Sequence, residues 1–161
     1  IGQLNVNYRG SFLAVDAGTV RRRRSLLLAG DRVPDQELQA ADGGPVGLYD
    51  LLAKGWVLLL CPGADAPPDR YRALRDLAAV SRSVVGDAVQ AVAIGPVPGE
   101  DVAGLTMLLD TKGEVAARFG AGSGLAALIR PDGYLGYRGA LEDAGALTSY
   151  LARVFAMRMV G

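Results

Sequence analysis

A continuous apolar run at residues 56–61, followed by a second, largely apolar run at residues 89–94, limits what this sequence can fold into. A run that is apolar at every position is typical of a strand buried on both faces at the centre of a parallel sheet. The residues between the runs predict an amphipathic helix over about 68–85, with Pro68 in its first turn and Gly86 just past its end. A helical crossover between two buried strands makes those strands parallel neighbours. The sequence therefore predicts a β-α-β unit at the core of an α/β fold.

The flanking sequence predicts how this unit is extended into a larger sheet. The expected elements are an extended lead-in at 30–35, a short edge strand at 36–39 closed by a turn at 42–45, one or two helical turns at 48–53, a strand at 105–109, a helix at 112–119, a hairpin of 125–130 and 134–138 around Pro131-Asp132-Gly133, and a helix at about 141–158. The apolar stripe expected on the last helix is Leu141, Ala144, Leu147, Leu151, Val154 and Phe155. This order predicts an α/β, thioredoxin-like fold, in which a mixed central sheet carries helices on both faces.

The composition excludes several classes of function. A length of 161 residues suits one well-buried domain. The 17 basic and 17 acidic residues balance, which gives no support for a nucleic-acid partner. The absence of histidine removes the usual general base and the usual zinc ligand. A single cysteine excludes an internal disulfide and fits a reducing cytoplasm.

Residues 1–28 differ in pattern from the rest of the chain. Residues 4–8 alternate between apolar and polar side chains, which suggests a short strand, and Arg21–Arg24 form a basic block. We interpret the block as a solvated linker or a face docked on an acidic protein surface, because no aromatic residues interleave it as in single-strand binding. No apolar run is long enough to span a bilayer and no signal-peptide layout is present, so we expect no membrane partner. The start at Ile1 suggests a piece of a longer polypeptide.

The strand-to-helix junction at residues 61–68 is where a thioredoxin-like fold carries its reactive cysteines. Here the segment Ala66-Pro67-Pro68-Asp69 stands in place of a Cys-x-x-Cys motif. Cys61 lies at the end of a strand, before the helix, where the helix dipole cannot lower the pKa of its thiol, and we interpret it as a buried core residue. Asp65 and Asp69 could form an acid/base pair, but carboxylates near a helix start are more often capping or charge–dipole residues.

Two further features have a functional and a structural interpretation. The stretch Phe119-Gly120-Ala121-Gly122-Ser123-Gly124 resembles a nucleotide-binding loop, but it follows a helix and precedes a strand. That order is the reverse of the one that places phosphate on a helix N-terminus, so we reject the match. Tyr134, Tyr137 and Arg138 could form a recognition patch on the last hairpin, although aromatic residues in strands more often pack.

Three stretches together resemble the C-terminal thioredoxin-like domain of FAD-dependent (class A) aromatic or polyketide hydroxylases of the phenol hydroxylase type. They are Gly30-Asp31-Arg32-Val33-Pro34-Asp35, the segment 42–51, and Leu128-Ile129-Arg130-Pro131-Asp132-Gly133-Tyr134 with Arg138 beyond it. Residues 4–11 look like the connector that leaves the catalytic part in that family. The resemblance implies that residues 1–28 are a connector from an upstream FAD-containing region and that 29–161 form the thioredoxin-like domain.

The resemblance also implies where the chemistry of the parent enzyme lies. FAD and NAD(P)H are implied for the parent, whereas no G-x-G-x-x-G motif opens a β-α-β unit here, so we assign no catalytic, cofactor-binding or metal-binding residue to this chain. The implied partners are the catalytic domains of the same polypeptide, with a possible homodimer. The tails of such enzymes generally lack redox cysteines, and no proline stands near Leu125, where a thioredoxin would carry a cis-proline. Two alternatives stay open: a stand-alone peroxiredoxin-like thiol enzyme using Cys61, and an interaction module unconnected with flavins.

Overall fold

A computed structural model describes residues 15–16, 26–63, 66–95, 105–120 and 124–160. These residues form one mixed sheet whose strand order is β1-β8-β7-β4-β5-β6-β2-β3. The strands are β1 (Val15–Asp16), β2 (Glu37–Ala40), β3 (Pro45–Gly47), β4 (Trp56–Cys61), β5 (Val89–Gly95), β6 (Thr106–Leu109), β7 (Leu125–Ile129) and β8 (Leu135–Gly139). The helices are α1 (Leu48–Leu52), α2 (Pro68–Val85), α3 (Glu114–Phe119) and α4 (Ala144–Val160), with a short 3-10 helix, η2 (Gly86–Ala88), after α2.

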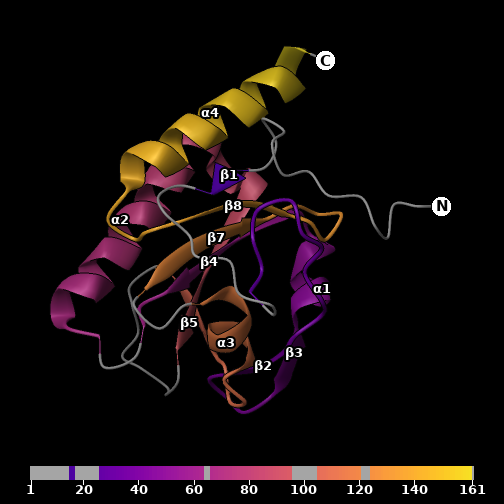
Figure 1. The fold of residues 1–161 in the computed structure, drawn as a ribbon, viewed down its shortest axis with the longest axis vertical. Coiled ribbons are helices and arrows are strands. Elements are labelled where there is room, and N and C mark those ends of the chain that lie inside the picture. The colour runs from indigo at the N-terminus through magenta and orange to yellow at the C-terminus, as the bar shows by residue number, and fades with distance from the viewer. Residues whose placement is uncertain (1–14, 17–25, 64–65, 96–104, 121–123, 161) are drawn as a thin grey trace.

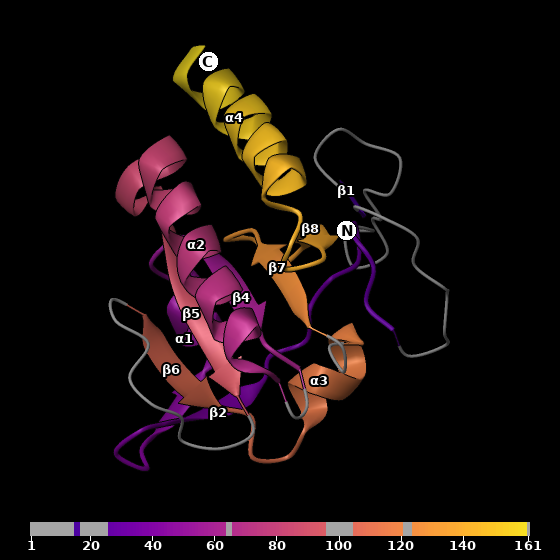
Figure 2. The ribbon, with the colours of Figure 1, turned by 90° about the vertical axis from the view of Figure 1, so that its left-hand side faces the viewer.

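The predicted β-α-β unit forms the centre of this sheet. Strand β4 pairs parallel to β5 and antiparallel to β7, and β5 pairs parallel to β6. Helices α2 and α4 cover one face of the sheet and α1 and α3 cover the other (Figures 1 and 2). The expected mixed sheet with helices on both faces is therefore confirmed.

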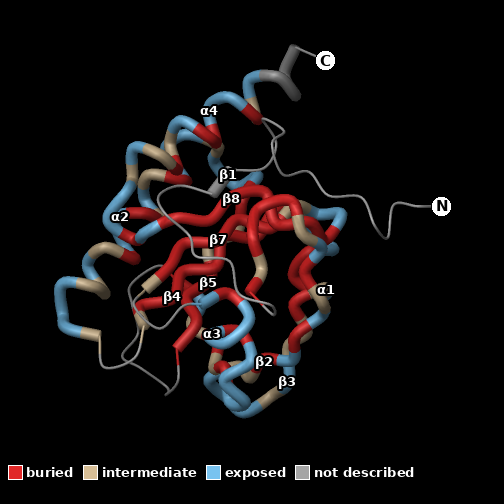
Figure 3. The backbone as a smooth tube through the Cα atoms, viewed as in Figure 1, coloured by how far each residue is buried: buried red, intermediate tan, exposed pale blue. Residues whose placement is uncertain are grey.

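The alternation of side chains along β4 divides the interior into two cores. Val57, Leu59 and Cys61 pack on the side of α1 and α3. Trp56, Leu58 and Leu60 pack on the side of α2 and α4. All six residues of β4 are buried (Figure 3), and each fully buried leucine contributes about 1.5–3 kcal/mol to stability through loss of apolar surface from water.

One predicted strand position and one predicted helix boundary were wrong. Residues 37–40 are not an edge strand, because Pro45–Gly47 pairs with them as β3 and takes the outer position. Proline has no backbone N–H to donate, so it suits such an outer strand. Helix α4 begins at Ala144 rather than near Leu141, because Asp143 caps it: the Asp143 carboxylate accepts a hydrogen bond from the Ala146 backbone N–H at 3.0 Å.

The N-terminal part of the described chain is attached to the far edge of the sheet. Strand β1 runs parallel to β8, with Val15 opposite Tyr137. Leu26 and Leu28 are buried, and the backbone N–H of Leu27 donates to the carbonyl of Arg118 at 2.7 Å. The predicted strand at residues 4–8 and the arginine block Arg21–Arg24 lie outside the described residues, and the division of the chain at residue 28 stays a prediction. Within the described residues, no helix combines the length and apolar character needed to cross a membrane.

Candidate functional site

The cysteine thiol at the carboxyl end of β4 is buried and unreactive. Cys61 is only 5% exposed. Burial, and secondarily the negative charge of Asp110, raise the pKa of this thiol from 9.0 to about 12. Asp110 follows β6 and accepts a hydrogen bond from the backbone N–H of Ala116 at 3.0 Å. Because the thiolate is the nucleophile, a thiol with so high a pKa is inert near neutral pH, which supports the interpretation of Cys61 as a core residue.

The helix start beside this cysteine carries no reactive group among its described residues. Pro67 is the N-cap residue of α2 and offers no side-chain hydrogen bond. Asp69 lies in the first turn, is exposed, and approaches the guanidinium of Arg72 at 3.8 Å. That position supports a charge–dipole contribution from Asp69 rather than a capping bond. Asp65, its predicted acid/base partner, lies outside the described residues.

The side chain of Arg70 contacts three segments that are separate in the sequence, one of which directly follows β4. Its Nη1 donates to the carbonyl of Pro62 at 3.2 Å, and its Nε lies 3.2 Å from a carboxylate oxygen of Glu142. It also packs on Gly124, whose φ is +98° and where an added Cβ would collide with Nη1 of Arg70. Our sequence reasoning missed this role, because nothing local marks an arginine in a helical pattern as a link between distant loops.

The hairpin residues proposed as a recognition patch are buried, which confirms the packing interpretation. Tyr134, Tyr137 and Arg138 are 4%, 0% and 6% exposed. The ring of Tyr137 lies 5.7 Å from that of Tyr150, and burial raises the pKa of each of these phenols to about 12. Nη1 of Arg138 donates to the carbonyl of Leu27 at 2.7 Å, so this side chain holds the N-terminal segment against the sheet.

The three stretches that carry the family resemblance meet in space. Arg32, from the first, forms an isolated antiparallel bridge with Tyr134, from the third. Its guanidinium carbon lies 5.8 Å from the centre of the Tyr134 ring and 5.9 Å from the centre of the Tyr49 ring, which belongs to the second. The Tyr49 hydroxyl donates to the carbonyl of Val33 at 2.5 Å. These contacts indicate that the three stretches form one structural unit, stabilised by cation–π contacts of the Arg32 guanidinium with both rings.

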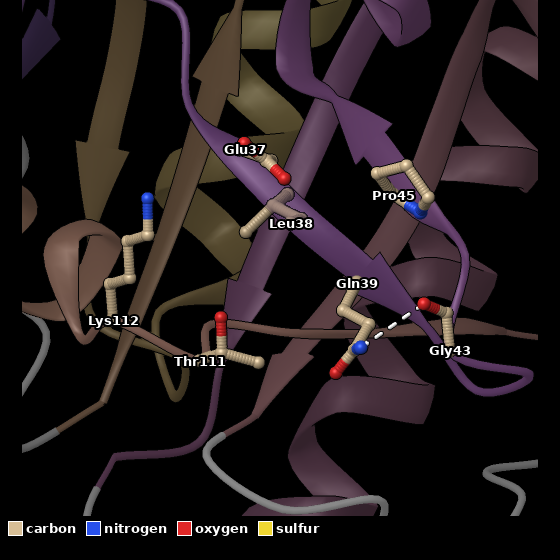
Figure 4. Close-up of a pocket in the computed structure, with 7 residues that line it drawn as sticks. All are labelled: Glu37, Leu38, Gln39, Gly43, Pro45, Thr111 and Lys112. Atoms are coloured by element: carbon tan, nitrogen blue, oxygen red, sulfur yellow. Dashed lines mark hydrogen bonds between the residues drawn. The ribbon is translucent and has the colours of Figure 1, made fainter.

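A shallow groove lies where β2 and β3 face the loop that follows β6 (Figure 4). Glu37, Gln39, Thr111 and Lys112 are among the residues that line it, and the Gln39 amide donates to the carbonyl of Gly43 at 3.1 Å. Its volume of about 210 Å³ is below the 300 Å³ or so at which small-molecule sites usually begin. No cluster of acidic or cysteine side chains suited to a metal occurs in the described parts of the chain.

Sheet order, helix placement and the strand-to-helix junction define a thioredoxin-like domain. Residues 27–157 match the family described as "Aromatic-ring hydroxylase, C-terminal", and the chain therefore belongs to that family. No curated protein matches the chain at a significant level.

Solved structures share this fold. The flavin-dependent monooxygenase PieE, in complex with FAD and substrate, is 24% identical over 92% of this chain, with a TM-score of 0.66. Aklavinone-11 hydroxylase, in a ternary complex with FAD and aklavinone, is 29% identical over 88% of this chain, with a TM-score of 0.58. The match covers 24% of each of those two chains, so this chain spans about a quarter of their length. A thiol peroxidase from Chromobacterium violaceum is 14% identical over 84% of this chain and 89% of its own, with a TM-score of 0.64, and shares the fold alone.

Proposed function

We propose that this chain is the non-catalytic C-terminal domain of a bacterial, cytoplasmic monooxygenase that uses FAD and NAD(P)H to hydroxylate aromatic, polyketide-type substrates. The observation that carries the proposal is the family match over residues 27–157. Two flavin-dependent enzymes contain a matching part that makes up 24% of their chains. The catalytic steps and the cofactors would then belong to other parts of the polypeptide.

The proposed role is structural: docking on the catalytic domains or contact between two subunits. The inert state of Cys61 supports this role, because burial and the charge of Asp110 keep its thiol protonated. The same burial argues against a stand-alone peroxiredoxin-like enzyme that would use this cysteine.

Helix α4 is the surface that we propose for docking. Over residues 144–156, where side-chain exposure is described, its exposed positions carry small side chains and a single charge: Gly145, Ser149, Ala152, Arg153 and Ala156. A surface with few charges loses little hydration when a partner covers it, as is typical of the centre of protein interfaces. The exposed side of α2, in contrast, carries several charged residues, including Arg72, Arg75 and Asp76.

The test compares the full polypeptide with a form that lacks residues 29–161. We expect the shortened form to retain bound flavin while its melting temperature falls or its subunit number changes. An unchanged melting temperature together with an unchanged subunit number would refute the structural role.

A matched pair of variants tests the docking surface more finely. Ala152→Glu on α4 and Ala79→Glu on α2 each add a carboxylate at an exposed helical alanine. We expect Ala152→Glu to lower the melting temperature of the full polypeptide and to leave that of the isolated chain unchanged. Ala79→Glu is expected to affect neither, and equal effects of the two variants would exclude α4 as the docking surface.

A further inference from the structure

A second groove, larger than the one in Figure 4, lies at the opposite end of β4 from Cys61. It is formed by the C-terminal part of α2, by η2 and by the first residues of β4 and β5, and its volume is about 360 Å³. That volume falls within the range of small-molecule sites, about 300–1,000 Å³. Its lining residues include Lys54, Trp56, Ala78, Ser81, Arg82 and Val89.

One wall of this groove is apolar and contains an aromatic ring. Trp56 and Val89 are both 6% exposed, and Ala78 is half-buried. The ring of Trp56 also packs against Phe155 of α4, with centres 5.2 Å apart, which fixes the position of the indole. A ring fixed in position beside small aliphatic side chains suits a flat, apolar ligand, because such a ligand loses water-exposed surface when it packs against the ring.

The same wall contains two buried polar atoms without partners in the described structure, Nε1 of Trp56 and Oγ of Ser81. The indole N–H can only donate a hydrogen bond, and the hydroxyl can donate one. Buried donors in native proteins are normally satisfied by protein, water or ligand atoms. Two unsatisfied donors on residues of one groove therefore point to an acceptor, such as an oxygen atom, that belongs there.

The charged residues around this groove indicate the sign of the charge that a ligand would carry. Lys54 and Arg82 are exposed at its rim, whereas the lining contains one carboxylate, that of Asp87. The balance favours an anion, and an arginine can bind a carboxylate with two parallel hydrogen bonds.

We propose that this groove binds a small, flat aromatic compound that carries an acidic oxygen, such as an aromatic carboxylate. The ring of the ligand packs on Trp56 and Val89, its oxygen accepts from the indole N–H and the Ser81 hydroxyl, and its charge faces Arg82. Both donors have almost no solvent-accessible surface, so the oxygen of the ligand reaches them only after neighbouring side chains move. The site lies on the other side of the domain from the inert thiol and is independent of the proposed structural role.

The experiment uses the fact that Trp56 is the only tryptophan. The ¹⁵N-labelled chain therefore shows a single indole N–H resonance, which reports on this donor without an assignment. We expect 2-naphthoate to move this resonance downfield until the change in chemical shift reaches a plateau. Neutral 2-naphthylmethanol is expected to bind at least about tenfold more weakly. Absence of saturation below about 10 mM naphthoate, or equal binding of the neutral compound, would overturn the proposal.

Variants locate the ligand within this groove. Arg82→Gln is expected to raise the dissociation constant about tenfold, and Ser81→Ala is expected to raise it about threefold or more. Arg75→Gln is the matched control, an exposed arginine of α2 that does not line the groove, and it is expected to leave the constant unchanged. The dispersion of the amide resonances shows in the same spectra that each variant is folded. Equal constants for Arg82→Gln and the unsubstituted chain would contradict the proposal, as would equal losses for Arg82→Gln and Arg75→Gln.

Discussion

The reactivity of Cys61 is the most direct test of the claim that the redox end of this fold is inert. A rise in the pKa of the thiol from 9.0 to about 12 lowers the fraction of thiolate near pH 8 by about 1,000-fold. The thiol is also only 5% exposed, so a reagent must wait for a local opening of the sheet. We therefore expect an aromatic disulfide reagent at pH 8 to label the folded chain at least about 1,000 times more slowly than the chain in concentrated guanidinium.

Two variants calibrate this measurement. Ser83→Cys adds a thiol at an exposed position of α2 and is expected to react at once with one equivalent of reagent. Asp110→Asn removes the nearby charge and retains an acceptor for the Ala116 N–H, so labelling of Cys61 is expected to speed up by less than about tenfold, since burial is the larger cause of the high pKa. If Cys61 in the folded chain were labelled as fast as the cysteine introduced by Ser83→Cys, the reasoning would be refuted and a thiol-based activity would again be a candidate function.

Three further predictions concern stability. Gly124→Ala is expected to lower the free energy of unfolding by about 1–3 kcal/mol in a urea titration, because φ is +98° and the new Cβ displaces Arg70. Gly43→Ala is the control: φ is +93° and an added Cβ would have no atom within 4 Å, so its loss of stability measures the backbone strain alone. Arg138→Met leaves the carbonyl of Leu27 without its donor and is expected to cost about 1–3 kcal/mol, and a loss below about 0.5 kcal/mol would show that this contact does not hold the N-terminal segment. Alkaline pH is expected to destabilise the fold, because three buried acids keep their protons to about pH 12 in the folded chain. They are Cys61, Tyr137 and Tyr150. The unfolded chain releases these protons from about pH 9 to 10, so the free energy of unfolding should be level below that range and fall up to about pH 12, and a flat profile across the window would contradict the assigned pKa values.

The elements that sequence patterns predicted well have their signals next to them in the chain. Helix α2 begins at Pro68 and ends before Gly86, as its flanking proline and glycine indicated. Strands β7 and β8 flank Pro131-Asp132-Gly133, which is a turn in the structure. Buried strand β4 was evident because all of its side chains are apolar.

The features that sequence patterns did not predict depend on partners far along the chain. Strand β2 joins the main sheet through Gln39, which pairs with Leu109, 70 positions later, and no local signal encodes that register. Tyr150 was left out of the predicted apolar stripe of α4, but it is fully buried against Tyr137. The sequence alone does not show whether the polar hydroxyl or the apolar ring of a tyrosine decides its position. The inertness of Cys61 was inferred from missing groups, whereas the charge of Asp110 that reinforces it comes from the residue that follows another strand, β6.

The placement of the two lysines has a practical consequence. Lys112 lines the groove of Figure 4 and Lys54 lines the larger one, and the sequence contains no other lysine. Apart from the α-amino group, amine-directed chemistry can thus modify this chain only at those two places. Reductive methylation with ¹³C-formaldehyde would install one reporter beside each groove without any substitution, so that occupancy of either could be followed separately in the intact molecule.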